Sequence, residues 1–184
     1  MNATAFMRME KLKGAGIILV AARHNRREIA AELGAAGNID PARSLLNVRL
    51  VGPDSAQGVA NLARELMRTA GIDKPRKDAV LAIEFMFSLP GHLSFDSIGY
   101  FRDCMAWVAA RFGGETNILS ADVHFDEAQP HCHVLLLPMC DGTLQGSDMY
   151  GGPRKLEDHQ MSFHEAVAAR YGLCRARPKP SAAE

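Results

Sequence analysis

Three histidines, His124, His131 and His133, fall within one stretch of ten residues. Apolar residues alternate before His124, and an apolar run follows His133, so both ends of the stretch are predicted to be β-strands. Side chains two residues apart on a strand share a face, and an antiparallel partner strand can place His124 opposite the other two. Neutral imidazole binds zinc, manganese, iron, cobalt or nickel, and three such ligands leave positions open for water and substrate oxygens. The spacing therefore predicts an open metal site.

Two acidic residues, Asp126 and Glu127, lie in the loop predicted between the histidine strands. They could accept hydrogen bonds from imidazole N–H groups behind a bound metal, or they could only shape the turn, and the sequence leaves both interpretations open. In a rival interpretation, Asp126 and two histidines form the two-His-one-carboxylate iron site of an oxygenase. A third interpretation is a non-catalytic DNA-binding or replication-accessory module whose metal is structural or absent.

Hydrophobic periodicity predicts the elements that must position these residues. Strands are predicted over 6–12, 45–50 and 78–88, and helices over 17–32, 55–71, 94–112 and 157–171, although 17–20 would also suit a buried strand. Alternation along the strands gathers polar side chains on one face, namely Asn47, Arg49, Glu84, Ser120, Asp122 and the three histidines. This pattern predicts an α+β fold, an antiparallel β-sheet with helices packed on one face and a metal-binding groove on the other.

Length and composition limit the architecture and the compartment. A chain of 184 residues that is 47% hydrophobic is long enough for one well-buried domain. We expect that domain over 1–174 and a disordered tail over 175–184. The 21 basic and 21 acidic residues cancel, so any basic surface must be local. Four cysteines without a paired-thiol motif, no signal segment and no apolar run of membrane-spanning length predict a cytoplasmic protein without a membrane segment.

Three motifs occur in order along the chain: His24-Asn25-x-Arg27, then Asn38-x-Asp40-x-x-Arg43-Ser44-x-x-Asn47-x-x-Leu50, then His124-x-Asp126-Glu127-x-x-Pro130-His131-x-His133. In this order they resemble the motifs of the Mob/Pre (MobV-type) plasmid mobilisation relaxases of the HUH endonuclease superfamily. The segment from Lys77 to Glu84 is also similar to that family's next segment, so the resemblance runs from about Phe6 to Tyr171.

The resemblance implies a relaxase that nicks one DNA strand at a plasmid transfer origin and stays covalently attached to the cut end, in plasmid mobilisation or recombination. It implies His24 as the nucleophile, with Glu84 orienting or deprotonating it, and Arg27 as a further catalytic residue. The implied metal, Mn²⁺ or Mg²⁺, is held by the three histidines. The rival nucleophiles would be the phenols of Tyr100, Tyr150 and Tyr171, none of which lies in a motif of the kind that tyrosine relaxases use.

The partner implied by the resemblance is single-stranded DNA at the transfer origin. Five residues near the proposed nucleophile are candidates for DNA contacts: Arg23, Arg26, Arg43, Asn47 and Arg49. Arg27 and Arg43 could contact phosphate or brace His24, and Asn47 could position the active-site loop. Accessory or coupling proteins are further candidate partners. Relaxases of this group continue into a C-terminal region implicated in dimerisation, so the sequence leaves the oligomeric state open.

Overall fold

The structure is a computed structural model that describes residues 3–29, 32, 38–91 and 95–175. Apart from Arg175, the tail expected over 175–184 lies outside the described residues.

A five-stranded antiparallel sheet organises the molecule, with strand order β1-β3-β5-β4-β2. Its strands are β1 (Phe6–Lys13), β2 (Val48–Val51), β3 (Val80–Ser88), β4 (Ile118–His124) and β5 (His131–Leu136). Strands β3, β4 and β5 alternate apolar and polar side chains, as the sequence predicted. The α+β class and the antiparallel sheet are therefore confirmed.

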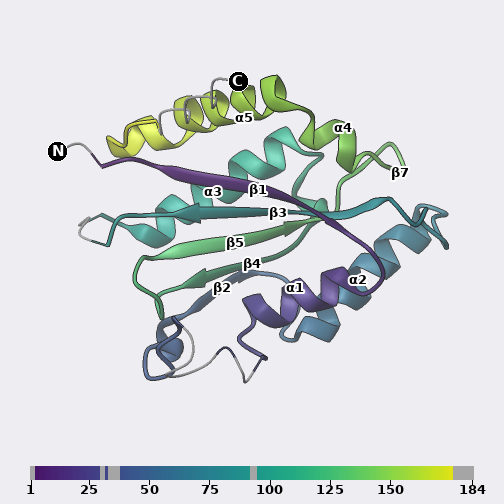
Figure 1. The fold of residues 1–184 in the computed structure, drawn as a ribbon, viewed down its shortest axis with the longest axis horizontal. Coiled ribbons are helices and arrows are strands. Elements are labelled where there is room, and N and C mark those ends of the chain that lie inside the picture. Colours follow the sequence, from purple (N-terminus) through teal and green to yellow (C-terminus); the bar gives the residue numbers. More distant parts are fainter. Residues whose placement is uncertain (1–2, 30–31, 33–37, 92–94, 176–184) are drawn as a thin grey trace, which may run out of the picture.

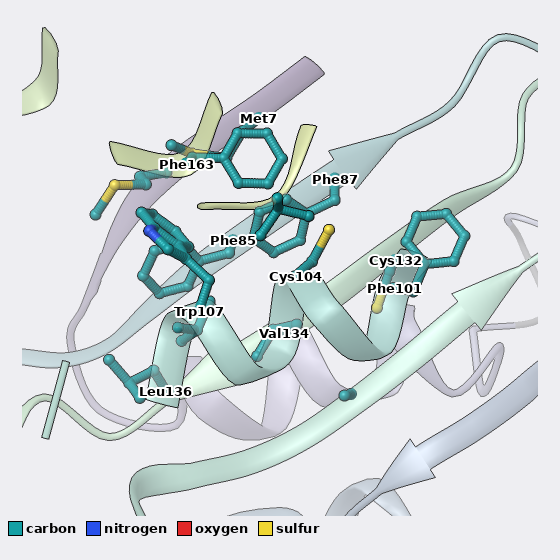
Figure 2. Close-up of a cluster of buried hydrophobic side chains, with 14 of the residues drawn as sticks. Met7, Phe85, Phe87, Phe101, Cys104, Trp107, Cys132, Val134, Leu136 and Phe163 are labelled. Carbon is teal, nitrogen blue, oxygen red and sulfur yellow. The ribbon is translucent and has the colours of Figure 1, made fainter. Parts of the chain in front are cut away.

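One face of the sheet carries the aromatic core. Helices α3 (Ser97–Arg111) and α5 (Pro153–Ala166) cover this face (Figure 1). Phe85 and Phe87 of β3 meet Trp107 of α3 and Phe163 of α5, and all four are buried (Figure 2). The Phe85 and Trp107 rings meet edge to face with centroids 6.2 Å apart, a favourable arrangement for aromatic pairs. This packing supports the histidine-bearing strands from the face of the sheet opposite the histidines.

The second face is divided between helices and polar side chains. Helices α1 (Ile17–Asn25) and α2 (Ala56–Thr69) cover one part of it (Figure 1). Ile18 and Ala22 of α1, Val59 of α2, and Leu135 and Leu137 from the sheet side are buried together there. The expected groove occupies the remaining part of this face, where β4 ends and β5 begins, so helices pack on both sides of the sheet rather than on one alone.

Some element boundaries differ from the prediction. The strand predicted over 45–50 is shorter, because the 3₁₀ turn η2 (Ser44–Leu46) precedes β2. The helix predicted over 17–32 ends at Asn25. Arg27, just beyond it, has a φ of 57°, a left-handed conformation that stops a helix. The other elements are η3 (Glu115–Asn117), β6 (Met139–Cys140), β7 (Thr143–Leu144), α4 (Gly146–Tyr150) and η4 (Ala168–Tyr171).

Candidate metal centre and active site

The register of β4 and β5 brings the three histidines together. His124 is the pairing partner of His131, and Asp122 is the partner of His133. The three imidazole centroids lie 5.0 to 5.3 Å from one another, and no ring belongs to a residue more than 7% exposed. Cys132, between the two histidines on β5, points to the opposite face and lies in the aromatic core (Figure 2). The predicted convergence of the three rings on one face is therefore present.

Each of the three rings has one nitrogen committed to an oxygen acceptor. His124 Nε2 donates to the main-chain oxygen of Asn25 at 2.7 Å, and His131 Nδ1 donates to the main-chain oxygen of Gln129 at 2.9 Å. His133 Nδ1 donates to Glu84 Oε1 at 3.0 Å. Metal-binding histidines usually hold their second N–H in this way, which fixes the tautomer and the ring orientation. The lone pairs left over are on His124 Nδ1, His131 Nε2 and His133 Nε2.

These remaining nitrogens face one another without a proton between them. His124 Nδ1 and His131 Nε2 are 3.2 Å apart, and neither carries a proton when the other nitrogen of its ring is the donor. A shared proton would require a charged ring, yet burial and the positive charge of Arg27 lower the pKa of His124 to about 2. Burial also lowers the pKa of His131. Ligand atoms of the three side chains lie within 4.8 Å of one another, so this donor set fits a divalent metal ion.

Asp126 faces the protein framework. It is fully buried and accepts hydrogen bonds from Arg27 Nε at 3.1 Å, Arg27 Nη2 at 2.6 Å, Ser44 Oγ at 2.9 Å and Asn47 Nδ2 at 2.7 Å. Burial opposes the charge of the carboxylate, but the bonds from Arg27, Asn47 and Ser44 outweigh it and lower the pKa of Asp126 well below its usual range. Between its two predicted roles, the contacts favour shaping the loop over holding an imidazole.

Glu127 contacts both Arg27 and the edge of the histidine cluster. Its Oε1 lies 2.7 Å from Arg27 Nη2 and 3.5 Å from His131 Nε2, the nitrogen that carries the lone pair. The carboxylate therefore adds negative charge beside the cluster without donating or accepting a close hydrogen bond from an imidazole.

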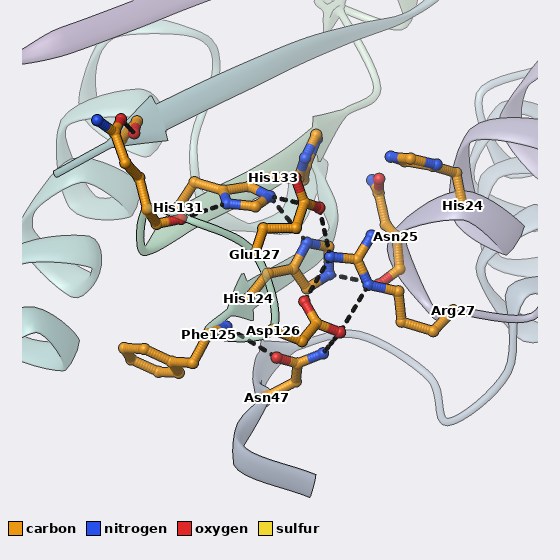
Figure 3. A network of polar contacts seen from close by, with 12 residues as sticks. His24, Asn25, Arg27, Asn47, His124, Phe125, Asp126, Glu127, His131 and His133 are labelled. Carbon is orange, nitrogen blue, oxygen red and sulfur yellow. Dashed lines mark hydrogen bonds and ion pairs between the residues drawn. The ribbon is translucent and has the colours of Figure 1, made fainter. Parts of the chain in front are cut away.

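His24 stands beside the cluster on a different element. It occupies the last turn of α1, and its ring centroid is 5.7 Å from that of His133 (Figure 3). Its side chain is 41% exposed, so a substrate can reach it. Its Nδ1 lies 2.8 Å from Glu32 Oε2. Glu32 was not identified from the sequence, since nothing in its charged surroundings distinguishes it from an ordinary solvated carboxylate.

Glu84 has a different contact from the one that the resemblance implied. Its Oε1 accepts bonds from His133 and from Asn25 Nδ2, the latter at 3.2 Å, and among the described residues the carboxylate at hydrogen-bond distance from His24 is that of Glu32. Burial disfavours the ionised form of Glu84, but the hydrogen bonds from His133 and Asn25, together with the neighbouring positive charge, outweigh it and lower the pKa of Glu84. Glu84 therefore orients a metal-ligand candidate and the end of α1, while Glu32 contacts the nucleophile candidate.

The predicted basic residues divide into buried and exposed groups. Arg26 lies inside the protein, because its side chain is only 7% exposed and pairs with Asp122 at 2.8 Å, and its contact with DNA stays a prediction. Arg27 is 8% exposed and pairs with Asp126 and Glu127. Asn47 is used inside the protein, because its Oδ1 accepts from the Phe125 amide at 2.8 Å (Figure 3). The exposed members of the predicted set are Arg23, Arg43 and Arg49.

A hollow of about 510 Å³ opens beside the cluster. Met86, Ser88, Glu127, Gln129 and His131 are among the residues that line it. A second hollow of about 360 Å³ lies between the end of α1 and β2, and His124 is one of its lining residues. Among the residues that the structure describes, no helix combines the length and the apolar character needed to cross a bilayer.

Comparison with known proteins gives consistent matches. The family model described as plasmid recombination enzyme matches residues 1–184. A plasmid recombination enzyme from a Bacillus species is 32% identical over 154 residues, covering 79% of this chain and 36% of the relative. One from Streptococcus agalactiae is 29% identical over 170 residues, covering 83% of this chain and 33% of the relative. The chain thus spans about a third of the length of these curated relatives.

A solved structure shares the fold. It is the MobM relaxase domain bound to plasmid pMV158 oriT DNA, in a Mn-bound crystal structure at pH 6.8. The TM-score is 0.81 at 27% sequence identity, and the match covers 99% of this chain and 94% of that chain. With a family match along its whole length and this shared fold, the chain belongs to the Mob_Pre family of plasmid recombination enzymes, the family that its motifs resemble.

Proposed function

We propose that this chain nicks and rejoins one DNA strand at a plasmid transfer origin through a covalent histidine–DNA intermediate, with a divalent metal as cofactor. One observation carries the proposal: an accessible imidazole, His24, is held beside three buried imidazoles whose lone pairs are oriented for a cation. A nucleophile beside a metal-ligand cluster is what phosphoryl transfer requires.

His24 has the contacts of an oriented nucleophile. Glu32 can only accept, so the 2.8 Å contact places the ring proton on His24 Nδ1 and leaves the Nε2 lone pair for attack on phosphorus. The new P–N bond forms as the bond from phosphorus to the leaving oxygen breaks, and the resulting phosphoramidate conserves the energy for rejoining. The Glu32 carboxylate would stabilise the positive charge that the ring gains during attack.

The surrounding residues hold His24 and the histidine cluster in place. Asn25, next to His24, accepts from His124 through its main chain and donates to Glu84 through its side chain, so one residue links the nucleophile helix to two sides of the cluster. Arg27 is proposed as a positioning residue because its guanidinium ties the same segment to Asp126. A Mn²⁺ or Mg²⁺ ion held by His124, His131 and His133 would offset negative charge developing on the phosphate oxygens.

The tyrosines support histidine as the nucleophile. The sequence has three, and Tyr100, Tyr150 and Tyr171 all pack against the aromatic core on the far face of the sheet. Tyr171 donates to Asp103 at 2.8 Å, and burial raises the pKa of Tyr100 far above its ordinary value. The rival oxygenase would need Asp126 as a metal ligand, yet that carboxylate already accepts four hydrogen bonds.

The test of the proposal is the covalent adduct. Purified chain with Mn²⁺ should relax a supercoiled plasmid carrying its own transfer origin and leave protein on the cut strand after denaturation. His24→Ala should remove the adduct at unchanged metal content, whereas His164→Ala, which deletes an imidazole from α5, should leave it. An adduct of normal yield in H24A would assign the nucleophile to another residue, which mass spectrometry of the DNA-linked peptide would identify.

A further inference from the structure

Two leucines are exposed beside the candidate active site. Leu45 is 94% exposed and Leu46 is 57% exposed. Three of the six exposed large apolar side chains of the described residues fall between positions 45 and 48. Burying a leucine side chain stabilises a folded protein, so two adjacent exposed leucines forgo that stabilisation. We refer to Leu45 and Leu46 as the leucine tip.

The leucine tip lies on a turn that hydrogen bonds anchor on both sides. The η2 turn closes through the bond from the Leu46 amide to the Arg43 oxygen at 2.8 Å. Residues on either side of the tip, Ser44 and Asn47, both donate to Asp126 Oδ2, at 2.9 and 2.7 Å. The tip is therefore fixed from both sides, so its exposure comes from the way the turn is anchored.

The anchor of the leucine tip is the loop of the metal centre. Asp126 is two residues after His124 and also binds Arg27, which follows His24. Through Asp126, the residues that flank the tip are linked to the loop after His124 and to the segment after His24. A DNA strand whose phosphate reaches the histidine cluster must continue along the surface next to it.

The charges flanking the leucine tip suit a nucleic acid. Arg43 and Arg49 are exposed on either side in the sequence, and Arg43 Nη1 contacts the Glu127 oxygen at 3.3 Å, next to the cluster. Cationic side chains beside an apolar projection match a ligand with a charged backbone and flat apolar faces. Proteins use leucine in this way, as a wedge against or between bases.

We infer that the leucine tip is a base-contacting wedge, which packs against the unstacked bases of the DNA strand next to the phosphate that is cut. The inference rests on the proposed function and adds a recognition element to it. Neither leucine is among the residues that define the three sequence motifs. Arg43 and Arg49 contact the phosphate backbone of the DNA and position the strand, and the two leucines cover its bases.

The experiment compares two single strands that differ only in their bases. One is a fluorescein-labelled strand of mixed sequence with the 22-nucleotide length of the oriT DNA in the MobM structure, and the other is an abasic strand of equal length. Fluorescence anisotropy in low salt gives the affinity for each. Leu45→Ser with Leu46→Ser should weaken binding to the base-bearing strand about tenfold and leave binding to the abasic strand unchanged.

Two controls isolate the effect of the leucines. Met161→Ser changes an apolar side chain of α5 that is 42% exposed, and it should bind both strands as the starting protein does. The melting temperature of L45S/L46S should stay within about 2 °C of the starting protein, since exposed positions contribute little to stability.

Equal affinity of L45S/L46S and the starting protein for the base-bearing strand would overturn the wedge, as would an equal loss on both strands. Self-association that L45S/L46S abolishes, with DNA binding intact, would make the tip an interface between two copies and also overturn it. The nicking assay separates this inference from the proposed function. If the starting protein nicks normally and L45S/L46S binds DNA as the starting protein does, only the wedge is overturned. If L45S/L46S weakens binding to the base-bearing strand alone but no adduct forms on His24, only the histidine mechanism is overturned.

Discussion

Asp126 joins three segments of the chain through one buried carboxylate. Its donors come from the segment just after α1, from η2 and from the residue before β2. Asp126→Asn removes the charge that Arg27 neutralises, although Glu127 remains as a partner. Loss of one member of a buried ion pair typically costs 3–5 kcal/mol, so D126N should lower the free energy of unfolding by about 3 kcal/mol in urea denaturation at pH 7.

The comparison for D126N is Asp54→Asn. Asp54 pairs with Arg49 at 2.6 Å, but its side chain is 96% exposed, so D54N should cost less than about 1 kcal/mol. Because the pKa of Asp126 is lowered in the folded protein, its contribution is present above about pH 4 and is lost as the pH falls further. The difference between D126N and the starting protein should therefore shrink toward pH 3, and a difference independent of pH would contradict the ion-pair explanation.

Helix α1 is the element that places the nucleophile candidate beside the histidine cluster. Ala22 is fully buried where α1 meets α2 and the sheet, two residues before His24. Ala22→Leu would push α1 away from α2 and the sheet and lower the free energy of unfolding by about 1–3 kcal/mol. Since small misplacements of a reacting group slow catalysis strongly, adduct formation should fall about tenfold or more.

The control for A22L lies on the same helix. Val20 is 58% exposed, so Val20→Leu adds bulk where nothing is displaced and should keep the starting rate of adduct formation. Metal content, measured by atomic absorption, should be unchanged in both variants because no ligand candidate lies on α1. Loss of metal in A22L would mean that the helix supports the cluster itself.

Elements defined by their own residues were predictable, and those defined by distant contacts were not. Strand β3 and helix α2 follow directly from apolar periodicity, and Ser55 caps α2 by accepting from the Gly58 amide. Residues 45–47 have strand-like composition, yet Ser44 and Asn47 are pulled into a turn by Asp126, which is about eighty positions away in the sequence. Tertiary contacts overrode local propensity there.

The candidate site shows the same division. Period two along β4 and β5 placed the three histidines on one face, because register converts sequence spacing into geometry. The distance between His24 and His133 depends on how α1 packs on the sheet, and no local pattern reports that. The burial of Arg26 and the contact of Glu32 with His24 also depend on tertiary packing, so the sequence could not separate them from exposed charges.

For the molecule as a whole, metal binding should add stability to the folded state, because the unfolded chain does not gather the three imidazoles. A ligand present at a hundred times its dissociation constant adds about 2.7 kcal/mol. Saturating Mn²⁺ should therefore raise the melting temperature by several degrees, and EDTA should reverse the rise.

The rise in melting temperature should depend on the cluster alone. His133→Ala removes one of the three lone pairs and should abolish the Mn²⁺ effect, while His164→Ala should retain it. A similar rise in H133A would place the stabilising ion somewhere other than the histidine cluster.

Strand β5 presents imidazoles to one side and Cys132 and Val134 to the other, where both are fully buried in the aromatic layer. Any inherited change of volume in that layer shifts the same backbone that aims the imidazoles, since close-packed interiors transmit such displacements. Selection on DNA processing would consequently restrain residues that never meet DNA. Compensating pairs of substitutions between α3 and β5 should be how this interior diversifies over evolutionary time.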